Sequence, residues 1–395
     1  MQAVFRQVPT AGRAFHALIA ALAVLLIGGA WAFYNLEHFG HIVSGMNNQI
    51  VWGLPHVFAV FLIVAASGAL NVASIGSVFG KTEYKPLAPL SGLLALALLL
   101  GGLTILLLDL GRPDRLIVAM THFNFKSIFA WNMILYNGFI AIVVVYIWTA
   151  VVREGGKWNR PVGFIAFAWR ILLTTGTGSI FGFLVARDAF DSALYAPLFI
   201  ALSLSYGMAG FFILLVTVAR ATGETIPSAM VAKLQNLMVV FIVAALWFVA
   251  VLHLTNLYMT KHHDIERFIL VDGGVVTILF WLGQVLIGSL LPIILLLLPQ
   301  TRDSRVANVF AAGLVILGGL AQMYVTIIGG QMFPQVLFPG YLESSSFFDG
   351  VVHPYQPSVF ELLLGLGGVA VAVAILTLGL RLFPFAPYRL NPPTV

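Results

Sequence analysis

Polar and hydrophobic positions alternate along this chain in long blocks rather than at the two-residue period of a β-strand. An α-helix needs about 20 apolar residues to cross the hydrocarbon core of a membrane, and in lipid it satisfies its own backbone hydrogen bonds. We therefore predict an all-α integral membrane protein. Its ten transmembrane helices are expected at residues 14–34, 54–77, 88–109, 127–152, 161–186, 195–219, 234–258, 272–298, 306–328 and 358–382.

The first apolar stretch has a second interpretation as a secretory signal peptide. It follows Arg6 and Arg13, and the sequence Ala30-Trp31-Ala32 has the small residues of a cleavage site. The apolar run is longer than the core of an ordinary signal peptide, however. We therefore expect the stretch to remain as the first transmembrane helix.

Two weak matches suggest an internal repeat at an offset of 142 residues. Pro55 and Gly68 of the second stretch correspond to Pro197 and Gly210 of the sixth. Four helices per unit is an even number, so such a repeat would be parallel, as in some transporters.

The repeat predicts a single polytopic membrane domain, 1–395, built from two four-helix bundles. Helices two to five form the first bundle (54–187), helices six to nine form the second (195–328), and helices one and ten lie outside. Most loops are short. The one long loop, 329–357, is rich in aromatic residues and proline and contains no Lys or Arg.

Composition excludes a water-soluble protein. Hydrophobic residues make up 60% of the chain and charged residues only 9%, against about 25% charged residues in a typical soluble domain. The chain has no cysteine, which excludes disulfides and thiolate-ligated iron–sulfur clusters within it. The net charge of +5 comes from loop Lys and Arg residues and does not indicate a nucleic-acid partner.

The distribution of Lys and Arg predicts the orientation of the chain. Thirteen of the 20 lie in the termini and the loops on their side, six lie in the opposite loops, and Arg170 lies inside a helix. Because short cytoplasmic loops are enriched in positive charge, both termini should be cytoplasmic. The DLGRPDR loop and the 329–357 loop should face the periplasm of a bacterial inner (cytoplasmic) membrane.

Polar and ionisable side chains gather near the predicted periplasmic ends of the helices. Such residues are costly inside a membrane and are functional candidates for that reason. An amphipathic ligand with carbonyl groups, such as a quinone, needs donors and acceptors near one interface and apolar walls beneath, and its redox chemistry moves protons. The candidate quinone-binding residues are His56, Asp109, Arg112, Asn132, Tyr136, Arg187, Asp188 and Asp191.

Several of these residues have alternative interpretations. Asp109 and Arg112 would form a structural ion pair at a helix end if Pro113 stops the helix there. His56 and His253 are the one histidine pair at matching depth for a bis-histidine haem. The sequence leaves these readings open beside the quinone site.

Two further groups of residues could carry other chemistry. Arg170, near the cytoplasmic third of its helix, either extends its guanidinium towards the interface or belongs to a proton route. His262 and His263 are adjacent and could contribute to a metal site, although we predict no metal in this chain. No phosphate-binding loop is present, because the glycine-rich segments lack the required lysine.

Three segments resemble the NrfD-like family of polysulfide reductase membrane subunits. They are WGLPHVFAVFLIVAASGA in the second helix, LLLDLGRPDR…HFNFKSIFAWN around the third loop, and FWLGQVLIGSLLPIILLL in the eighth helix. The ten-helix length is similar to the longer branch, which includes HybB-like hydrogenase subunits. The segments RDAFDSALYAPLFI and TGTGSIF are closer to DsrP-like subunits of the sulfite-reductase-linked Dsr complex.

The resemblance implies a subunit of a quinone-dependent oxidoreductase complex that holds no haem or iron–sulfur cluster. Such a subunit would exchange electrons between menaquinone or ubiquinone and a periplasmic ferredoxin-like iron–sulfur subunit. The resemblance also implies further redox subunits, such as cytochrome c and cytoplasmic-facing subunits. The lipid bilayer surrounds the chain. The family's quinone pocket lies near the periplasmic face of the first bundle, so that His56, Asp109 and Tyr136 become the candidate catalytic residues.

The sequence also departs from hydrogenase-type members of the family. Trp131 stands where they have an acidic residue, and Gln284 stands where they have a glutamate. Both departures put a transmembrane proton path in doubt, and the sequence leaves proton translocation open. The alternatives are a membrane subunit of a hydrogenase or of a polysulfide or tetrathionate reductase, and, from another class, a secondary transporter with a site at mid-depth.

Overall fold

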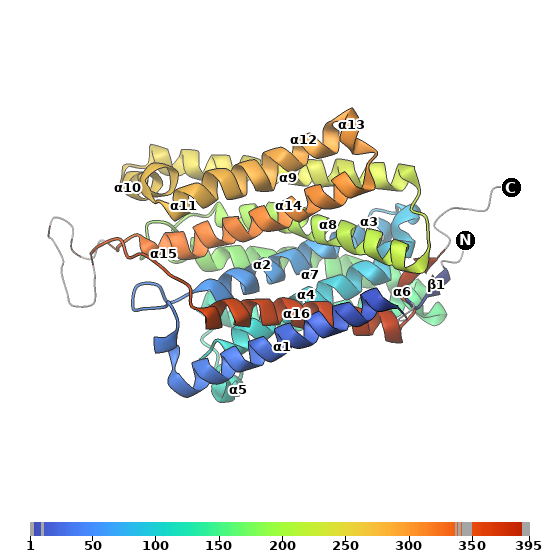
Figure 1. Ribbon diagram of the computed structural model, residues 1–395, viewed down its shortest axis with the longest axis horizontal. Helices are drawn as coiled ribbons and strands as arrows, with labels where there is room; N and C mark the ends of the chain where they lie inside the picture. The colour runs from blue at the N-terminus through green and yellow to red at the C-terminus, as the bar shows by residue number, and fades with distance from the viewer. Residues whose placement is uncertain (1–3, 9–11, 336–337, 339–340, 342–349, 389–395) are drawn as a thin grey trace.

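The structure is a computed structural model that describes residues 4–8, 12–335, 338, 341 and 350–388, and it is almost entirely helical (Figure 1). Within these residues, ten helical runs are long and apolar enough to cross a membrane, at the ten predicted places. The all-α fold class is therefore confirmed. The ten runs are Arg13–Phe39, Leu54–Ser77, Thr82–Leu108, Ile128–Val151, Gly156–Gly182, Tyr195–Thr222, Ser228–Tyr258, Val275–Leu297, Arg305–Met332 and Val359–Leu382.

These runs are assembled from regular α-helices, tight 3₁₀ turns and wider π-helical segments. The α-helices are α1 (Arg13–Phe39), α2 (Leu54–Ala69), α3 (Asn71–Ser77), α4 (Ala88–Leu108), α5 (Leu116–Thr121), α6 (Ile128–Val151), α7 (Asn159–Gly182), α8 (Tyr195–Thr222), α9 (Ser228–Tyr258), α10 (His263–Arg267), α11 (Val275–Ile278), α12 (Leu291–Leu297), α13 (Pro299–Arg302), α14 (Arg305–Tyr324), α15 (Gly330–Met332) and α16 (Val359–Leu382). The 3₁₀ turns are η1 (His41–Val43), η2 (Thr82–Leu87), η3 (Pro113–Arg115), η4 (Arg153–Trp158) and η5 (Thr260–His262), and the π-helical segments are η6 (Phe268–Asp272), η7 (Leu279–Leu290) and η8 (Val325–Gly329).

Local sequence explains several helix ends. Pro55 stands in the first turn of α2, where its fixed φ suits the helix and its missing N–H is not needed. At the start of α16 the Ser358 hydroxyl accepts from the Glu361 amide while the Glu361 carboxylate accepts from the Ser358 amide, which is a capping box. α8 ends at Gly223, whose φ of 69° is left-handed.

The structure differs from the prediction mainly at helix ends. α9 begins at Ser228 rather than at 234, because the helix continues past the most hydrophobic residues. The ninth run continues through η8 and α15 to Met332, so the first residues of the predicted 329–357 loop are helical. Much of the rest of that loop lies outside the described residues.

A short antiparallel ribbon, which the hydropathy pattern did not reveal, joins the two ends of the chain. Strand β1 (Val4–Arg6) pairs with β2 (Ala386–Tyr388), with Phe5 opposite Pro387. Beside it, Arg6 bonds the Thr222 carbonyl at the end of α8. Pairing between segments this far apart in sequence leaves no local signal.

Two groups of helices pack around a central contact between α2 and α8. We call α2, α3, α4, α6 and α7 the first bundle, and α8, α9, η7, α12 and α14 the second bundle. In their most hydrophobic windows, 83% of the α2 run is buried but only 17% of α1, which packs against α16 at the rim. α16 in turn contacts α4 and α2.

Glycine allows the close approach of α2 and α8. A Cβ on Gly207 would overlap the backbone of Gly68, and a Cβ on Gly68 would overlap the Ser203 carbonyl. Small residues of this kind let membrane helices pack backbone against backbone. Gly210, the partner of Gly68 in the suggested repeat, has no such neighbour; Gly207 occupies the crossing instead.

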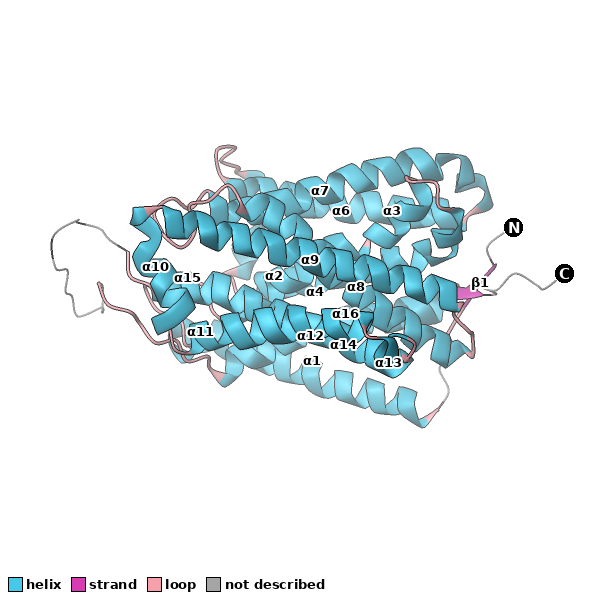
Figure 2. Ribbon diagram, turned by 90° about the horizontal axis from the view of Figure 1, so that it is seen from above, coloured by secondary structure: helices cyan, strands magenta, loops and turns pink. Residues whose placement is uncertain are grey.

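The long axis of the helices separates two ends of the molecule. Figures 1 and 2 both show the N- and C-terminal segments at one end, and α10 and α15 at the other. We call these the terminal end and the pocket end.

Candidate functional site

A pocket of about 760 Å³ lies in the first bundle, towards the pocket end. This volume is in the range of small-molecule sites. Residues from α2, α4, α5, α6 and α7 form its walls, and one residue, Ile327, comes from η8 of the second bundle. The apolar part of the lining is Val60, Ile63, Leu100, Leu103, Leu106, Leu107, Leu110, Leu116, Ala119, Met120, Met133, Ile180 and Ile327.

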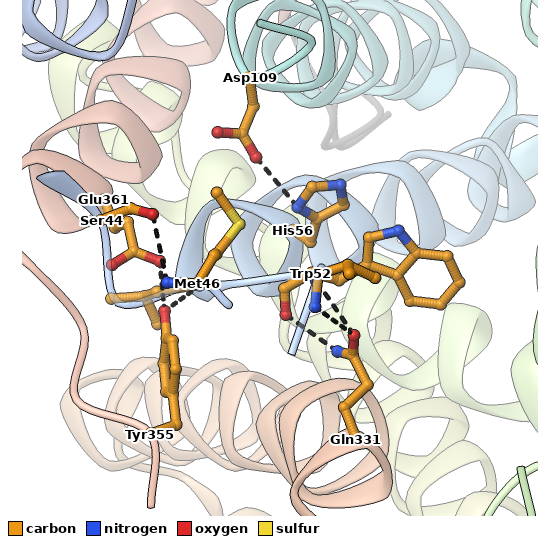
Figure 3. A network of polar contacts seen from close by, with 10 residues as sticks. Ser44, Met46, Trp52, His56, Asp109, Gln331, Tyr355 and Glu361 are labelled. Carbon is orange, nitrogen blue, oxygen red and sulfur yellow. Dashed lines mark hydrogen bonds and ion pairs between the residues drawn. The ribbon is translucent and has the colours of Figure 1, made fainter. Parts of the chain in front are cut away.

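His56 and Asp109 stand at the head of this pocket (Figure 3). Nδ1 of His56 lies 3.1 Å from Oδ2 of Asp109, an ion-pair distance, although the two groups are not aligned as a hydrogen bond. The Asp109 side chain is only 1% exposed, and no donor among the described residues bonds either of its oxygens. A buried carboxylate in this condition is costly unless another molecule supplies a donor.

Local sequence places Asp109 at this position. It is the residue that follows the last residue of α4, Leu108, and caps the helix, and Gly111, with a φ of +70°, makes the turn that comes next. A left-handed φ favours glycine because it has no Cβ. The DLG sequence thus ends the helix at the acid and leaves the Asp109 carboxylate facing His56 in the first turn of α2.

Asn132 and Tyr136 line the pocket one turn apart on α6, as predicted for residues of one helix face. The Asn132 amide is fixed because it donates to the carbonyls of Ile128 and Gly176 at 2.9 and 3.0 Å. Tyr136 is buried, and Thr177 of α7, which also lines the pocket, places its hydroxyl 3.4 Å from the amide oxygen of Asn132. The hydroxyl-bearing wall is therefore built jointly by α6 and α7.

Three aromatic residues at the head of the pocket were not predicted: Trp52, Phe129 and Phe181. The Trp52 indole stacks on His56 with ring centroids 6.2 Å apart and planes 28° apart, and it meets the edge of Phe181 at 6.0 Å. Phe129 lies 6.1 Å from the same indole. In the sequence these residues resemble an interfacial aromatic belt, so only the fold distinguishes them.

The predicted alternative pairing of Asp109 with Arg112 is not formed. Arg112 instead makes a two-point contact with Asp114, at 3.1 and 3.2 Å, which raises the pKa of the guanidinium and lowers that of the Asp114 carboxyl. Both side chains are exposed at the pocket mouth. The turn at Gly111 separates Arg112 from the Asp109 carboxylate, although the short spacing of the two residues in the sequence suggested that they would pair.

Arg187, Asp188 and Asp191 do not line the pocket. Asp188 and Asp191 lie 3.4 and 3.2 Å from the ammonium of Lys261, and the bond with Asp191 raises the pKa of that lysine. Arg187 donates to the Gln49 carbonyl at 2.7 Å, and its burial lowers the pKa of its guanidinium. These residues fasten loops at the pocket end rather than facing the cavity.

The loop that carries Trp52 is anchored on two sides (Figure 3). Gln331 of α15 bonds the backbone of Trp52. On the other side, the Tyr355 hydroxyl accepts from the Leu54 amide at 2.7 Å and donates to the fully buried Glu361 carboxylate at 2.5 Å. Burial, reinforced by that carboxylate, raises the pKa of Tyr355. The sequence marks Glu361 only as a polar residue at a helix start.

Arg170 does not extend to the interface. It is 2% exposed inside the first bundle, where its Nη2 donates to the Asn71 side chain at 2.8 Å. Thr174, one turn nearer the pocket, donates to Ser67 of α2. Polar groups therefore continue beneath the pocket, which the sequence pattern of one-sided clustering did not reveal.

The second bundle carries its own histidine–carboxylate pair at the pocket end. Nδ1 of His253 lies 2.7 Å from Glu266, and Asn256 donates to the other Glu266 oxygen at 2.8 Å. Glu266 is fully buried and was not predicted. His56 and His253, the candidate haem pair, thus each face a carboxylate of their own.

The remaining histidine candidates contact backbone carbonyls. His262 lies 2.7 Å from the Asp188 carbonyl, and His263 lies 2.9 Å from that of Leu257. In the part of the chain that the structure describes, no group of three or more histidine or acidic residues is placed to hold a metal ion.

A small cavity of about 20 Å³, room for about one water molecule, lies in the second bundle. Gln284 and Gln322 face it. Among the described residues, the amide nitrogen and oxygen of Gln284 have no hydrogen-bond partner. The amide oxygen of Gln322 has none either. Trp131, the other departure from hydrogenase-type sequences, is 46% exposed on the outer surface.

Comparisons with known proteins agree with this architecture. Residues 42–335 match the family described as polysulphide reductase, NrfD. An integral membrane subunit of an Hdr-like menaquinol oxidoreductase from Archaeoglobus fulgidus is 29% identical over 98% of both chains. A putative dimethyl sulfoxide reductase membrane subunit from Halobacterium salinarum is 27% identical over 95% of this chain and 92% of its own. One of the chains of polysulfide reductase from Wolinella succinogenes is 25% identical over 72% of this chain and 96% of its own.

Proposed function

The chain belongs to the polysulphide reductase NrfD family, and from this premise we propose that it is the quinone-interacting membrane subunit of a respiratory redox complex. Two relatives are named as membrane subunits, of a menaquinol oxidoreductase and a dimethyl sulfoxide reductase, and a third as part of a polysulfide reductase. The pocket in the first bundle is the proposed quinone site. Its position at one end favours this role over a secondary transporter, whose site would lie at mid-depth between discontinuous helices.

One observation carries the proposal: the buried carboxylate of Asp109, which accepts no hydrogen bond from the described residues, stands at the head of a largely apolar pocket. A quinol hydroxyl would donate to this carboxylate, and His56 lies 3.1 Å away to share the proton. Oxidation of a quinol to a quinone releases two electrons and two protons. Asp109 and His56 would accept the protons, as positioned general bases do.

The other pocket residues orient the ring. Tyr136 and Asn132 contribute polar groups to the lining, and Trp52 contributes an aromatic ring. Arg112, exposed at the mouth, is placed to meet an anionic partner surface. The electrons would pass to a ferredoxin-like iron–sulfur subunit docked at the pocket end, which the positive-charge distribution predicts to be periplasmic.

We assign the complex to dissimilatory sulfur metabolism, as a Dsr-type assembly. This assignment rests on the resemblance to DsrP-like subunits. The name of the Archaeoglobus fulgidus relative makes menaquinol the first quinol to test, with ubiquinol as the comparison. A membrane subunit of a hydrogenase or of a polysulfide or tetrathionate reductase is the alternative assembly.

The decisive experiment compares the wild type with a variant whose pocket is filled. Leu103→Trp places an indole among the lining residues of α4. Membranes with the wild-type complex should oxidise menadiol and bind a fluorescent 4-hydroxyquinoline N-oxide, which mimics a quinone. The variant should insert at the same level and lose both properties. Equal binding by the two proteins would contradict a quinone site in this pocket.

A further inference from the structure

Trp52 forms an aromatic wall of the pocket without belonging to a helix. It lies just before α2, and its indole stacks on His56 and meets Phe181. A loop residue has no helical hydrogen bonds of its own to fix its backbone. The orientation of the indole therefore depends on what holds this backbone.

The side chain of Gln331 holds the Trp52 backbone. Gln331 belongs to the ninth helical run of the chain, which is part of the second bundle. Its side-chain oxygen accepts from the amides of Val51 and Trp52, both at 3.0 Å. Its side-chain nitrogen donates to the carbonyls of Trp52 and Ile327, at 3.0 and 2.7 Å. Two donors and two acceptor sites are all that a carboxamide has, so every bonding position of Gln331 is used.

The π-helical segment η8 brings Gln331 to this position. Ile327 inside η8 lines the pocket, and Gln331 follows one turn later with 1% of its surface exposed. Gln49 then bonds the carbonyls of Gln331 and Met332 at 3.1 and 2.9 Å, and Arg187 bonds Gln49. Residues of both bundles and of the loop before α2 therefore support the contact between Gln331 and the Trp52 backbone.

We propose that Gln331 is a positioning residue that sets the angle of the Trp52 indole against the bound quinone ring. The second bundle in this way controls the affinity of a site that lies in the first. The inference rests on the proposed function, because it names what the indole faces. Stacking on aromatic rings depends on distance and tilt, and one well-made stack is equivalent to about a three- to tenfold change in affinity.

The test measures KM and kcat for menadiol with the assembled complex in membranes. Gln331→Met keeps the length of the side chain and removes its four bonds. We expect KM to rise about three- to tenfold with kcat nearly unchanged, and Trp52→Leu should do the same. The double variant should be no worse than Trp52→Leu alone, since both changes act through one ring.

Gln322→Met is the matched control. It removes a buried glutamine from the same helical run, but one that bonds Thr326 rather than the Trp52 loop. Its KM should equal that of the wild type. A rise in KM equal to that of Gln331→Met would indicate a general loosening of the run and would overturn the proposal.

Gln49→Ala provides a second test if the complex with Gln331→Met fails to assemble. It removes the two bonds that brace the Gln331 and Met332 carbonyls, and it should raise KM by a smaller factor. An unchanged KM in Gln49→Ala, or in an assembled Gln331→Met, would overturn the positioning role alone. A wild type that neither oxidises quinols nor binds the N-oxide would overturn the proposed function and this inference together.

Discussion

Each bundle presents a histidine beside a buried carboxylate at the same end of the molecule, yet the two pairs have opposite surroundings. In the first bundle, the Asp109 oxygens have no hydrogen-bond donor among the described residues and the pair faces a 760 Å³ pocket. In the second, both Glu266 oxygens are engaged, one by His253 and one by Asn256. The difference is one of hydrogen bonding rather than of residue type.

This comparison separates reactive from structural carboxylates. A buried carboxylate whose oxygens are bonded by the protein stabilises the fold, and removing it leaves its partners unsatisfied. A carboxylate left without donors costs stability and is retained where a ligand supplies them. The asymmetry between the bundles therefore predicts which substitutions affect activity and which affect stability.

The largest expected effect is on turnover. Asp109→Asn should lower quinol oxidation about a hundredfold or more, because the amide cannot accept a proton. The corresponding change in the second bundle, Glu266→Gln, should leave turnover within about twofold, because general-base catalysis needs a group that reaches the substrate. Steady-state rates at equal amounts of assembled complex test this ranking. Equal losses in both variants would show that the two pairs share one function.

For stability, we expect the opposite ranking of substitutions at Asp109 and Glu266. Glu266→Leu should destabilise the protein by about 3 kcal/mol, since it removes the partner of the half-buried His253 and of the buried Asn256. Asp109→Leu should cost less than about 1 kcal/mol, because it removes a carboxylate that accepts no hydrogen bond from the described residues and contacts only the partly exposed His56. Thermal unfolding of the detergent-purified protein measures both. A greater loss for Asp109→Leu would contradict the contrast.

A smaller effect is expected in the cavity of the second bundle. Replacing Gln284 and Gln322 together with Met removes three amide atoms that lack partners among the described residues, and with them the bond from Gln322 to Thr326, so stability should change by no more than about 1 kcal/mol. Quinol oxidation should not change. A large loss of activity in this double variant would place part of the reaction in the second bundle.

The smallest effect is expected at the surface of the pocket end. Lys261→Met should change stability by less than about 0.5 kcal/mol, because the lysine that joins Asp188 and Asp191 is 53% exposed. Its bond with Asp191 raises the lysine pKa above its ordinary value near 10.5. That contribution is fully present below the ordinary value and is lost only as the pH rises through the raised one. Melting curves between about pH 6 and 9 should therefore show the same small difference between variant and wild type.

Hydropathy alone was enough for the ten helices, because lipid leaves the backbone few alternatives to a helix. It was less informative at the ends. Ser228 extends α9 outside the apolar run, and the β1–β2 ribbon pairs residues from opposite ends of the chain. Both features arise from contacts that no local window contains.

The sequence located the head of the pocket but not its walls or supports. Four predicted residues line the same cavity: His56, Asp109, Asn132 and Tyr136. Polar residues near one interface of a small bundle can avoid lipid at only a few positions, and a shared cavity is one of them. Trp52 could not be distinguished from an interfacial aromatic residue. Gln331 acts on a loop 279 residues earlier in the chain, so no spacing in the sequence points to it.

The pairing of α1 with α16 has a consequence for biosynthesis. α1 packs at the rim of the bundle against α16, which is synthesised much later, and the β1–β2 ribbon pairs beside them. At typical rates of about 5–20 residues per second, translation of the intervening chain takes on the order of half a minute. During that time α1 must wait in lipid or beside the insertion machinery for the helix that it packs against.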